Sequence, residues 1–441
     1  MPQWTRSLRS RGGLWRHADF LHLWSAQTVS QFGTQVSLLA LPFVAIKVLH
    51  ASAFQVALLG TFDLLPFILF ALPAGVWVDR LPRRPVMIVA DLGRAAALAS
   101  IPAAKALGGL TIWQLYVVGF LTGTLTVFFD VAYQAYLPSL VGREHLVEGN
   151  SKLEISRSGA QLGGPGLAGV LIGAITAPYA VVADAVSFVG SAAFLGRIRS
   201  PEHRVRPRDD MRPGMLGEVR EGLRYLLGDR YLRAIAACTA YANFFTSLLF
   251  AVFLVYAVRR LGLDAKEVGL VFSVSNVGFL LAALTAGRVA NRLGTGPTII
   301  VGAGLIGPGL LLVPLAPASL AIPFFVIGLA VAAYGGVTYN IAALSYMQAT
   351  TPDRLLGRMN ATRRFIVWGT IPLGSLLGGV IAARFGVKTS VWVGAIGATV
   401  AFVPVLLSPF RSLKIVTPLV EPTAATEEEL RLQLETQIAD A

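Results

Sequence analysis

Long apolar runs alternate with short charged or glycine- and proline-containing segments along almost the whole chain. A helix needs about 20 apolar residues to cross the hydrocarbon core of a membrane. Twelve runs approach or exceed this length, at about 20–48, 54–78, 85–105, 110–134, 150–175, 177–196, 233–258, 267–290, 297–315, 319–346, 361–383 and 387–410. Backbone amides in lipid must be satisfied within their own segment, and no alternating pattern indicates a barrel, so we expect an all-α membrane protein with twelve transmembrane helices.

The twelve runs form two sets of six that match each other at a fixed offset. An offset of about 210 residues pairs Asn150 with Asn360, Gly159 with Gly369, Gly164 with Gly374, Gly169 with Gly379, Asp130 with Asn340 and Tyr136 with Tyr346. Two pseudo-symmetric six-helix bundles are therefore expected. In membrane transporters such repeats commonly place the substrate site between the halves near the bilayer midplane, where rocking of the halves exposes it alternately to each side.

Charge and composition fix the expected topology. The chain is 55% hydrophobic and 14% charged, and its net charge is +13. Its basic residues lie mainly beside the apolar runs, so membrane lipids explain them better than nucleic acid, for which we expect no role. Cationic loops stay on the cytoplasmic side, which predicts that both termini are cytoplasmic, and no removable signal peptide precedes the first span. The single cysteine, Cys238, excludes an intramolecular disulfide.

The same pattern divides the chain into five parts. We expect an N-terminal arm, a first six-helix bundle, a linker with an amphipathic helix, a second six-helix bundle and an acidic tail, at residues 1–18, 19–196, 197–232, 233–410 and 411–441 respectively.

The loop between the second and third runs concentrates charge in a very apolar chain. It reads Gly75-Val-Trp-Val-Asp79-Arg80-Leu-Pro-Arg83-Arg84-Pro85. The arginines alone would satisfy the positive-inside rule, but that rule requires neither the glycine nor the aspartate. We expect Gly75 to allow close helix approach, and we expect Asp79, Arg83 and Asp130 at the end of span 4 to form a latch on the cytoplasmic side in one state.

Three acidic positions lie inside the spans. Asp63 lies about ten residues into span 2, where an ionised carboxylate is costly, and it is our leading candidate for a proton carrier. A structural hydrogen bond is the alternative role for Asp63. For Asp184 in span 6 we favour a structural role. Asp91 and Arg94 are three residues apart in span 3, and we expect them to pair with each other.

Uncharged polar and aromatic residues suggest the lining of a substrate cavity. Gln27, Gln31 and Gln35 recur every four residues and form one stripe on span 1, which faces either a cavity or the hydrogen-bonding groups of other helices. The further candidates for the lining are Thr126, Tyr241, Asn243, Tyr334 and Asn340. Amides, hydroxyls and aromatic rings with few charges favour a neutral, amphipathic or cationic organic substrate over an inorganic ion.

Span 5 is rich in small residues around a proline. Close helix packing with a proline kink is expected at Gly159, Gly163, Gly164, Pro165 and Gly169. The chain has no phosphate-binding loop and no histidines at metal-ligand spacing, so we expect no cofactor and no metal site. It also shows no catalytic constellation, which argues against an enzyme.

The duplicated plan and the loop motif resemble the major facilitator superfamily over about residues 15–410. Within it, Asp19-Phe-Leu-His-Leu-Trp24, Phe129-Asp130-Val-Ala-Tyr-Gln134-Ala-Tyr-Leu-Pro138 and Gly357-Arg358-Met-Asn360 are similar to the bacterial subfamily of the enterobactin exporter and macrolide efflux proteins. The resemblance implies the major facilitator fold in a bacterial inner membrane and export of a drug-like compound or siderophore, typically by proton antiport. Small-molecule substrate, protons and lipids would be its partners, and we expect a monomer. An importer or lipid-handling facilitator on the same fold is the alternative.

Overall fold

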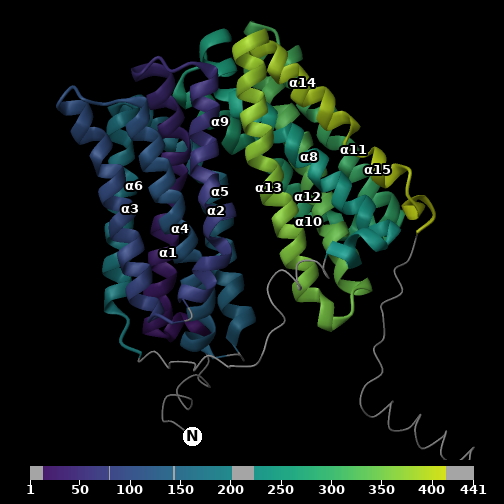
Figure 1. Cartoon of the computed structure of the whole chain (residues 1–441), viewed down its shortest axis with the longest axis horizontal. Coiled ribbons are helices and arrows are strands. Elements are labelled where there is room, and N and C mark those ends of the chain that lie inside the picture. Colours follow the sequence, from purple (N-terminus) through teal and green to yellow (C-terminus); the bar gives the residue numbers. More distant parts are fainter. Residues whose placement is uncertain (1–12, 79, 143–144, 201–222, 414–441) are drawn as a thin grey trace, which may run out of the picture.

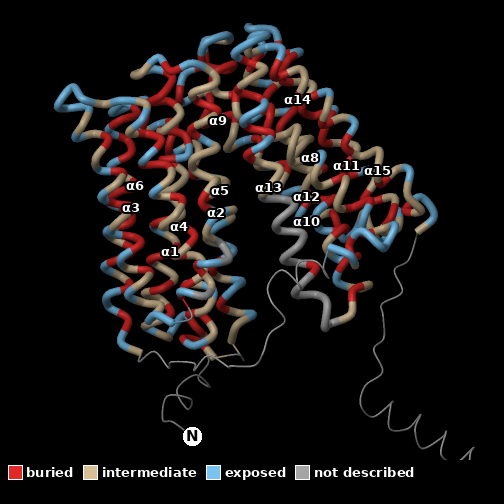
Figure 2. Tube along the Cα trace, viewed as in Figure 1, coloured by how far each residue is buried: buried red, intermediate tan, exposed pale blue. Residues whose placement is uncertain are grey.

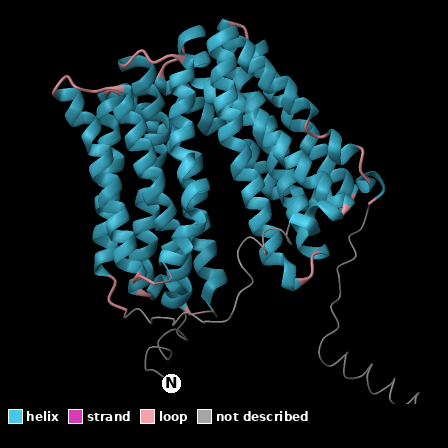
Figure 3. Ribbon diagram, in the orientation of Figure 1, coloured by secondary structure: helices cyan, strands magenta, loops and turns pink. Residues whose placement is uncertain are grey.

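The computed structural model describes residues 13–78, 80–142, 145–200 and 223–413, which form helices joined by short loops and contain no strand (Figures 1 and 3). Within these ranges, 11 helical spans are long and apolar enough to cross a membrane. The twelfth expected span is α13 (Asp353–Phe385), whose segment Gly369–Phe385 is a shorter apolar helix. The all-α class with two six-helix bundles is therefore confirmed.

The first bundle contains six spans. They are α1 (Ala18–Phe43) with a π-helical continuation Val44–Val48, α2 (Ala53–Val78), α3 (Arg83–Ala106), α4 (Ile112–Val141), α5 (Leu146–Ile175) and α6 (Ala177–Arg197). Helix α4 runs seven residues past the predicted end of its apolar run and stops at Gly142, whose φ of 77° ends the helix. The apolar pattern marks the edge of the hydrocarbon layer, whereas the helix ends where the backbone turns.

The second bundle repeats this order with two interrupted spans. It consists of α8 (Arg230–Val255) with a π-helical continuation Tyr256–Arg260, α9 (Ala265–Ser275), α10 (Val277–Leu293), α11 (Thr295–Leu315), α12 (Ala321–Thr350), α13, α14 (Val387–Val400) and α15 (Val403–Leu406). Helices α9 and α10 form one span that is divided at Asn276. Of the linker and the acidic tail expected from the sequence, residues 201–222 and 414–441 lie outside the described residues, and residues 223–228 are helical.

The duplication is visible in backbone geometry. The π-helical segments that begin at Val44 and Tyr256 are 212 residues apart, which is also an offset at which the loop motif and its second copy, Gly287–Pro297, align. Each segment is followed by a turn with the same hydrogen bond, from Ala51 to Ala45 in the first half and from Leu263 to Ala257 in the second. Spans 1 and 7 are therefore equivalent down to this irregularity.

The two bundles touch at one end and splay apart at the other (Figure 1). Helix α5 packs on α9, where a Cβ atom added to Gly169 would lie 2.5 Å from the carbonyl oxygen of Ala265. Helix α2 packs on α13 through a hydrogen bond of 3.1 Å from Ser375 Oγ to the carbonyl oxygen of Ala57. We call this end the closed side. The open side is the end where α6 finishes and α8 begins.

The buried residues follow the same division (Figure 2). One core cluster contains residues of both bundles, for example Val36, Ala168, Val252 and Val268, and it joins the halves at the closed side. The other two clusters are each confined to one bundle, around Phe20 and Tyr136 in the first and around Cys238 and Phe410 in the second. Hydrophobic burial thus holds the halves together at one end only.

Candidate functional site

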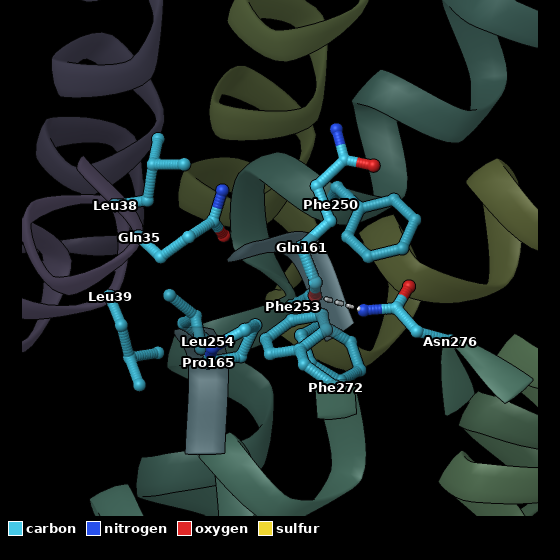
Figure 4. Close-up of a pocket in the computed structure, with 10 residues that line it drawn as sticks. All are labelled: Gln35, Leu38, Leu39, Gln161, Pro165, Phe250, Phe253, Leu254, Phe272 and Asn276. Carbon is cyan, nitrogen blue, oxygen red and sulfur yellow. Dashed lines mark hydrogen bonds between the residues drawn. The ribbon is translucent and has the colours of Figure 1, made fainter. Parts of the chain in front are cut away.

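A cavity of about 380 Å³ lies between the two halves, next to the contacts of the closed side (Figure 4). Helices α1 and α5 form one wall, and α8 and α9 with Asn276 form the other; the lining residues are Gln35, Leu38, Leu39, Gln161, Pro165, Phe250, Phe253, Leu254, Phe272 and Asn276. This volume falls within the usual range of small-molecule sites. The cavity therefore occupies the position expected for a substrate site in a duplicated transporter.

One wall of the cavity is aromatic. The ring centroids of Phe250 and Phe253 are 5.7 Å apart, and the ring of Phe272 lies 5.5 Å from that of Phe253. The ten lining residues include no charged side chain. Such a surface offers apolar and π contacts and a few amide groups, which suits an uncharged or amphipathic organic molecule.

A hydrogen bond across the halves explains why Asn276 and Pro165 both border the cavity. Proline has no amide hydrogen, so Pro165 leaves the carbonyl oxygen of Gln161, four residues earlier, without its helical partner. Asn276 Nδ2 donates a hydrogen bond of 2.6 Å to that oxygen from the break between α9 and α10. The carbonyl oxygen that the proline leaves unpaired in one half is thus satisfied by an amide at the interrupted span of the other half.

A second polar contact lies beside it. The hydroxyl of Ser273 accepts a hydrogen bond of 2.8 Å from the backbone amide of Gly166. Together with the bond from Asn276, it ties α5 to the end of α9 at the level of the cavity. Both bonds join the first half of the chain to the second.

The candidates for the lining divide into one that borders this cavity and seven that do not. Gln35 lines the cavity, whereas Gln27 is buried and Gln31 is half-buried on α1. Thr126 bonds within the first bundle and Tyr334 within the second, Asn243 is half-buried, and Tyr241 and Asn340 are exposed. The sequence indicated suitable residue types but not which helix face each would occupy.

Two of the lining residues that were not predicted can be recognised by weak signals in the sequence. Asn276 is an amide in the middle of an apolar span, and Gln161 lies four residues before a proline. The three phenylalanines carried no signal of their own, because aromatic residues are common in every apolar run of this chain.

The span-5 glycines have different surroundings. A Cβ atom on Gly164 would lie 2.5 Å from the Cβ of Gln35, and Gly169 contacts α9 as described above. At Gly159 a Cβ would meet no described atom within 4 Å, and at Gly163 the nearest is an atom of Phe32 at 3.9 Å. Gly164 thus lies where α5 packs closely on α1 and Gly169 where it packs on α9, whereas no described atom packs on Gly159.

The loop motif can be described only in part, since Asp79 lies outside the described residues. Arg83 Nη1 donates a hydrogen bond of 2.9 Å to the carbonyl oxygen of Ala135 on α4. Arg84 Nε donates one of 2.9 Å to the carbonyl oxygen of Leu195 at the end of α6, and Arg80 is exposed. The arginines thus bind helix ends within the first bundle.

Two other expectations for this motif concern Gly75 and Asp130. Among the described residues no atom lies within 4 Å of a Cβ placed on Gly75, so the expected close helix approach at this glycine stays a prediction. Asp130 is half-buried, and the positive charges that act on it are those of Arg94 and Arg157. Its pairing with Arg83 stays a prediction for another state of the transporter.

Asp63 lies on α2 where this helix crosses α4. A Cβ atom on Gly123 would clash with the backbone carbonyl oxygen of Asp63, so Gly123 is required for this crossing. The residue as a whole is half-buried, its carboxyl group lies inside the protein, and it does not belong to the cavity lining. The pair predicted in span 3 is confirmed, because Arg94 Nη2 forms a salt bridge with Asp91.

Comparison with known proteins decides the family. The model of the transmembrane secretion effector family matches residues 13–437 of this chain. The chain belongs to this family of major facilitator superfamily transporters. It is therefore a multi-pass membrane transporter.

Curated relatives and a solved structure agree with this assignment. The chain is 26% identical over 368 residues to the multidrug efflux pump Tap of Mycolicibacterium fortuitum, covering 81% of this chain and 88% of Tap. It is 24% identical over 375 residues to macrolide efflux protein A of Streptococcus pyogenes, covering 84% and 90%. The crystal structure of a bacterial homologue of the iron transporter ferroportin, in its inward-facing state, superposes on this chain with a TM-score of 0.70. The superposition covers 88% of this chain and 98% of that one at 18% sequence identity, which shows the shared fold.

Proposed function

We propose that this transporter exports a small hydrophobic or amphipathic organic molecule, such as a drug-like compound, by proton antiport with alternating access. The observation that carries the proposal is the cavity between the halves, with its phenylalanine wall and its uncharged amides. Efflux of drugs by the relatives Tap and macrolide efflux protein A supports the same class of substrate. Import, or handling of lipids, on the same fold is the second candidate.

The arrangement of the halves supports a direction of loading. The open side is the end at which α6 finishes and the loop with Arg83 and Arg84 lies, and the positive-inside rule assigns that end to the cytoplasm. In this assignment the structure is inward-open, in the membrane of a bacterial cell with both termini cytoplasmic. An exported molecule would enter the cavity from the cytoplasm and leave after the closed side opens.

The proton gradient is the energy source that the chain supports best. No phosphate-binding loop is present in the sequence, so the driving force would come from a gradient across the membrane. Carboxyl groups inside the spans can exchange protons as the transporter changes state, and Asp63 is one candidate for this role. We further propose that one chain forms a complete transport unit, because the cavity lies between its own two halves.

Transport by inverted membrane vesicles tests the proposal. We expect vesicles that contain the transporter to accumulate radiolabelled erythromycin when their interior is acidified, and to release protons as they do so. Phe253→Ala removes part of the aromatic wall and should lower uptake by about tenfold, since burial of an aromatic ring contributes strongly to small-molecule binding. Exposed Phe385→Ala is the matched control. Uptake only in right-side-out vesicles would favour an importer.

A further inference from the structure

A group of charged side chains is buried inside the first bundle, away from the cavity. Asp91 and Arg94 of α3 are 0% and 5% exposed, and Asp184 of α6 is 1% exposed. Asp130 of α4 is close enough to Arg94 for the charge of the guanidinium to act on it. We call these four residues the Arg94 cluster.

The surroundings of Arg94 hold its guanidinium firmly in place. The guanidinium carbon lies 4.5 Å from the ring centroid of Phe129 and 4.1 Å from that of Phe188, between two aromatic faces. Its two terminal nitrogens bond to Asp91 and to the hydroxyl of Thr126. Cation–π contacts on both faces and a salt bridge at one edge fix this cation between α3, α4 and α6.

The cluster contains more acid than base. Three carboxyl groups surround one guanidinium, and the other cation that acts on Asp130 is Arg157 of α5, which is exposed and bonded to Glu154 at 3.8 Å. Arg94 can balance one carboxylate. A second ionised carboxylate in the same interior would lack a countercharge, which strongly favours its protonated form.

The hydrogen bonds of Asp91 indicate where a proton fits. Within the described residues Asp91 Oδ2 has no hydrogen-bond partner, and neither has the hydroxyl of Ser191, which is fully buried beside the same carboxyl group. Buried polar atoms are rarely left unsatisfied. One hydrogen bond between them would satisfy both groups, either from the Ser191 hydroxyl to an ionised Oδ2 or from a protonated Oδ2 to the hydroxyl, so this pair can accommodate Asp91 with or without a proton.

Asp184 is connected to the helix that borders the cavity. Its Oδ2 accepts a hydrogen bond from the hydroxyl of Ser37 on α1, and its Oδ1 accepts one of 3.1 Å from Ser187. Gly33, one turn before Ser37, has no space for a Cβ against Ser187 and Asp184, so α1 lies directly on this carboxyl group. Any change at Asp184 therefore acts on α1.

Helix α1 lies between the cluster and the cavity. Gly33 and Ser37 are four residues apart and share the face that touches α6. Gln35 lies two residues from each, so it is on the opposite face, where it lines the cavity and packs on Gly164 of α5. One helix thus carries both a ligand of the buried carboxyl group and a wall residue of the substrate cavity.

We propose that the Arg94 cluster binds the proton that is exchanged for substrate, and that α1 couples its occupancy to the cavity through Ser37 and Gln35. This inference rests on the proposed function as a proton antiporter. The proton binds to a carboxylate of the cluster, and it leaves to water at the open side by way of Asp130, the half-buried member of the cluster. When the proton is lost, the Asp184 carboxylate binds the hydroxyl of Ser37 more strongly and α1 shifts. Substrate that binds beside Gln35 in turn favours the deprotonated state.

Proton release on substrate binding tests the proposal. Erythromycin is added to purified transporter in weakly buffered detergent solution, and released protons are measured with a pH-indicator dye. We expect the wild-type protein and the control Glu267→Gln, a partly exposed carboxylate in the first turn of α9 at the closed side, to release protons equally. Asp184→Asn and Asp91→Asn each remove a carboxyl group of the cluster, so substrate-induced release should fall to a small fraction of the wild-type amount or vanish. Undiminished release in both variants, or its loss in Asp63→Asn alone, would overturn the proposal.

Two further measurements keep the test informative if these variants fold poorly or if erythromycin is not a substrate. Ser37→Ala leaves all charges in place but removes a donor to the carboxylate of Asp184, so the pH at which half the protons are released should move upward. An unchanged midpoint contradicts the role of α1.

Infrared titration without substrate should show a protonated carboxyl band in the wild type that is lost in Asp184→Asn or Asp91→Asn. Wild-type protein with this band but no erythromycin binding would disprove the proposed substrate class and leave the proton site standing; absence of the band disproves the site.

Discussion

The guanidinium of Arg259 donates a hydrogen bond of 2.7 Å to the carbonyl oxygen of Ala51, and a second one of 3.2 Å to that of Ile46. Arg259 belongs to the π-helical end of span 7, whereas Ile46 belongs to the π-helical end of span 1 and Ala51 to the turn that follows it, so this side chain joins the two halves at the closed side. The equivalent position in the first half, 212 residues earlier, is Lys47, which is exposed. The closure is therefore asymmetric within a symmetric fold.

Arg259→Ala should make the closed side open more often. Hydrogen bonds from charged donors contribute about 1.5–3 kcal/mol, and 1.4 kcal/mol changes an equilibrium about tenfold. We expect a cysteine at the cavity position Leu38, in a Cys238→Ala background, to react about tenfold faster with an impermeant maleimide added from the closed side. Arg260→Ala, an exposed neighbour, is the control; equal acceleration by both would mean that loop charge, not this bond, holds the closure.

Asn276→Ala should impair transport through the contact between the halves. The carbonyl oxygen of Gln161 would lose the donor that replaces the missing proline amide, and a buried acceptor without a partner costs about 1–3 kcal/mol. We expect the rate of erythromycin uptake by inverted vesicles to fall by about tenfold. Asn340→Ala, at an exposed position outside the cavity lining, should transport normally, and a larger effect there than at Asn276 would place the substrate path elsewhere.

Two glycines of α5 should respond to alanine in opposite directions. Gly163→Ala adds a methyl group where the nearest atom is 3.9 Å away, and alanine favours the helix over glycine by about 1 kcal/mol, so thermal stability should rise. Gly169→Ala places the methyl group 2.5 Å from the carbonyl oxygen of Ala265, so the halves must separate at the closed side. Thermal unfolding measures the first effect, and spin-label distances between α5 and α9 measure the second. Equal behaviour of the two variants would contradict the packing of α5 on α9.

Arg83→Ala should alter the balance between states without changing the cavity. Its guanidinium bonds the carbonyl of Ala135 near the end of α4, and the expected latch with Asp79 and Asp130 would form when the open side closes. We expect the affinity for erythromycin to stay within about threefold of wild type while the uptake rate falls by about tenfold. Maleimide labelling of a cysteine at Leu38 from the open side reports the shift. Unchanged uptake and labelling would exclude a role of this loop in switching.

The candidate site was predictable in its place but not in its members. Duplication of six spans indicated a site between the halves, and a cavity lies there. Gln35 was identified because an amide is unusual in an apolar helix. Phe250, Phe253 and Phe272 were not, because their residue type does not distinguish a cavity wall from a helix face in lipid.

The sequence by itself determined the class of protein, the number and order of the spans, the duplication and the charged loop. It did so because lipid forces each apolar run of sufficient length to satisfy its own backbone hydrogen bonds as a helix. Only the tertiary structure decided which helix faces meet, since spans that are apolar on all sides carry little information about rotation. That is why the bond from Asn276 to Gln161, and the position of α1 between the Arg94 cluster and the cavity, appeared only when the helices were packed together.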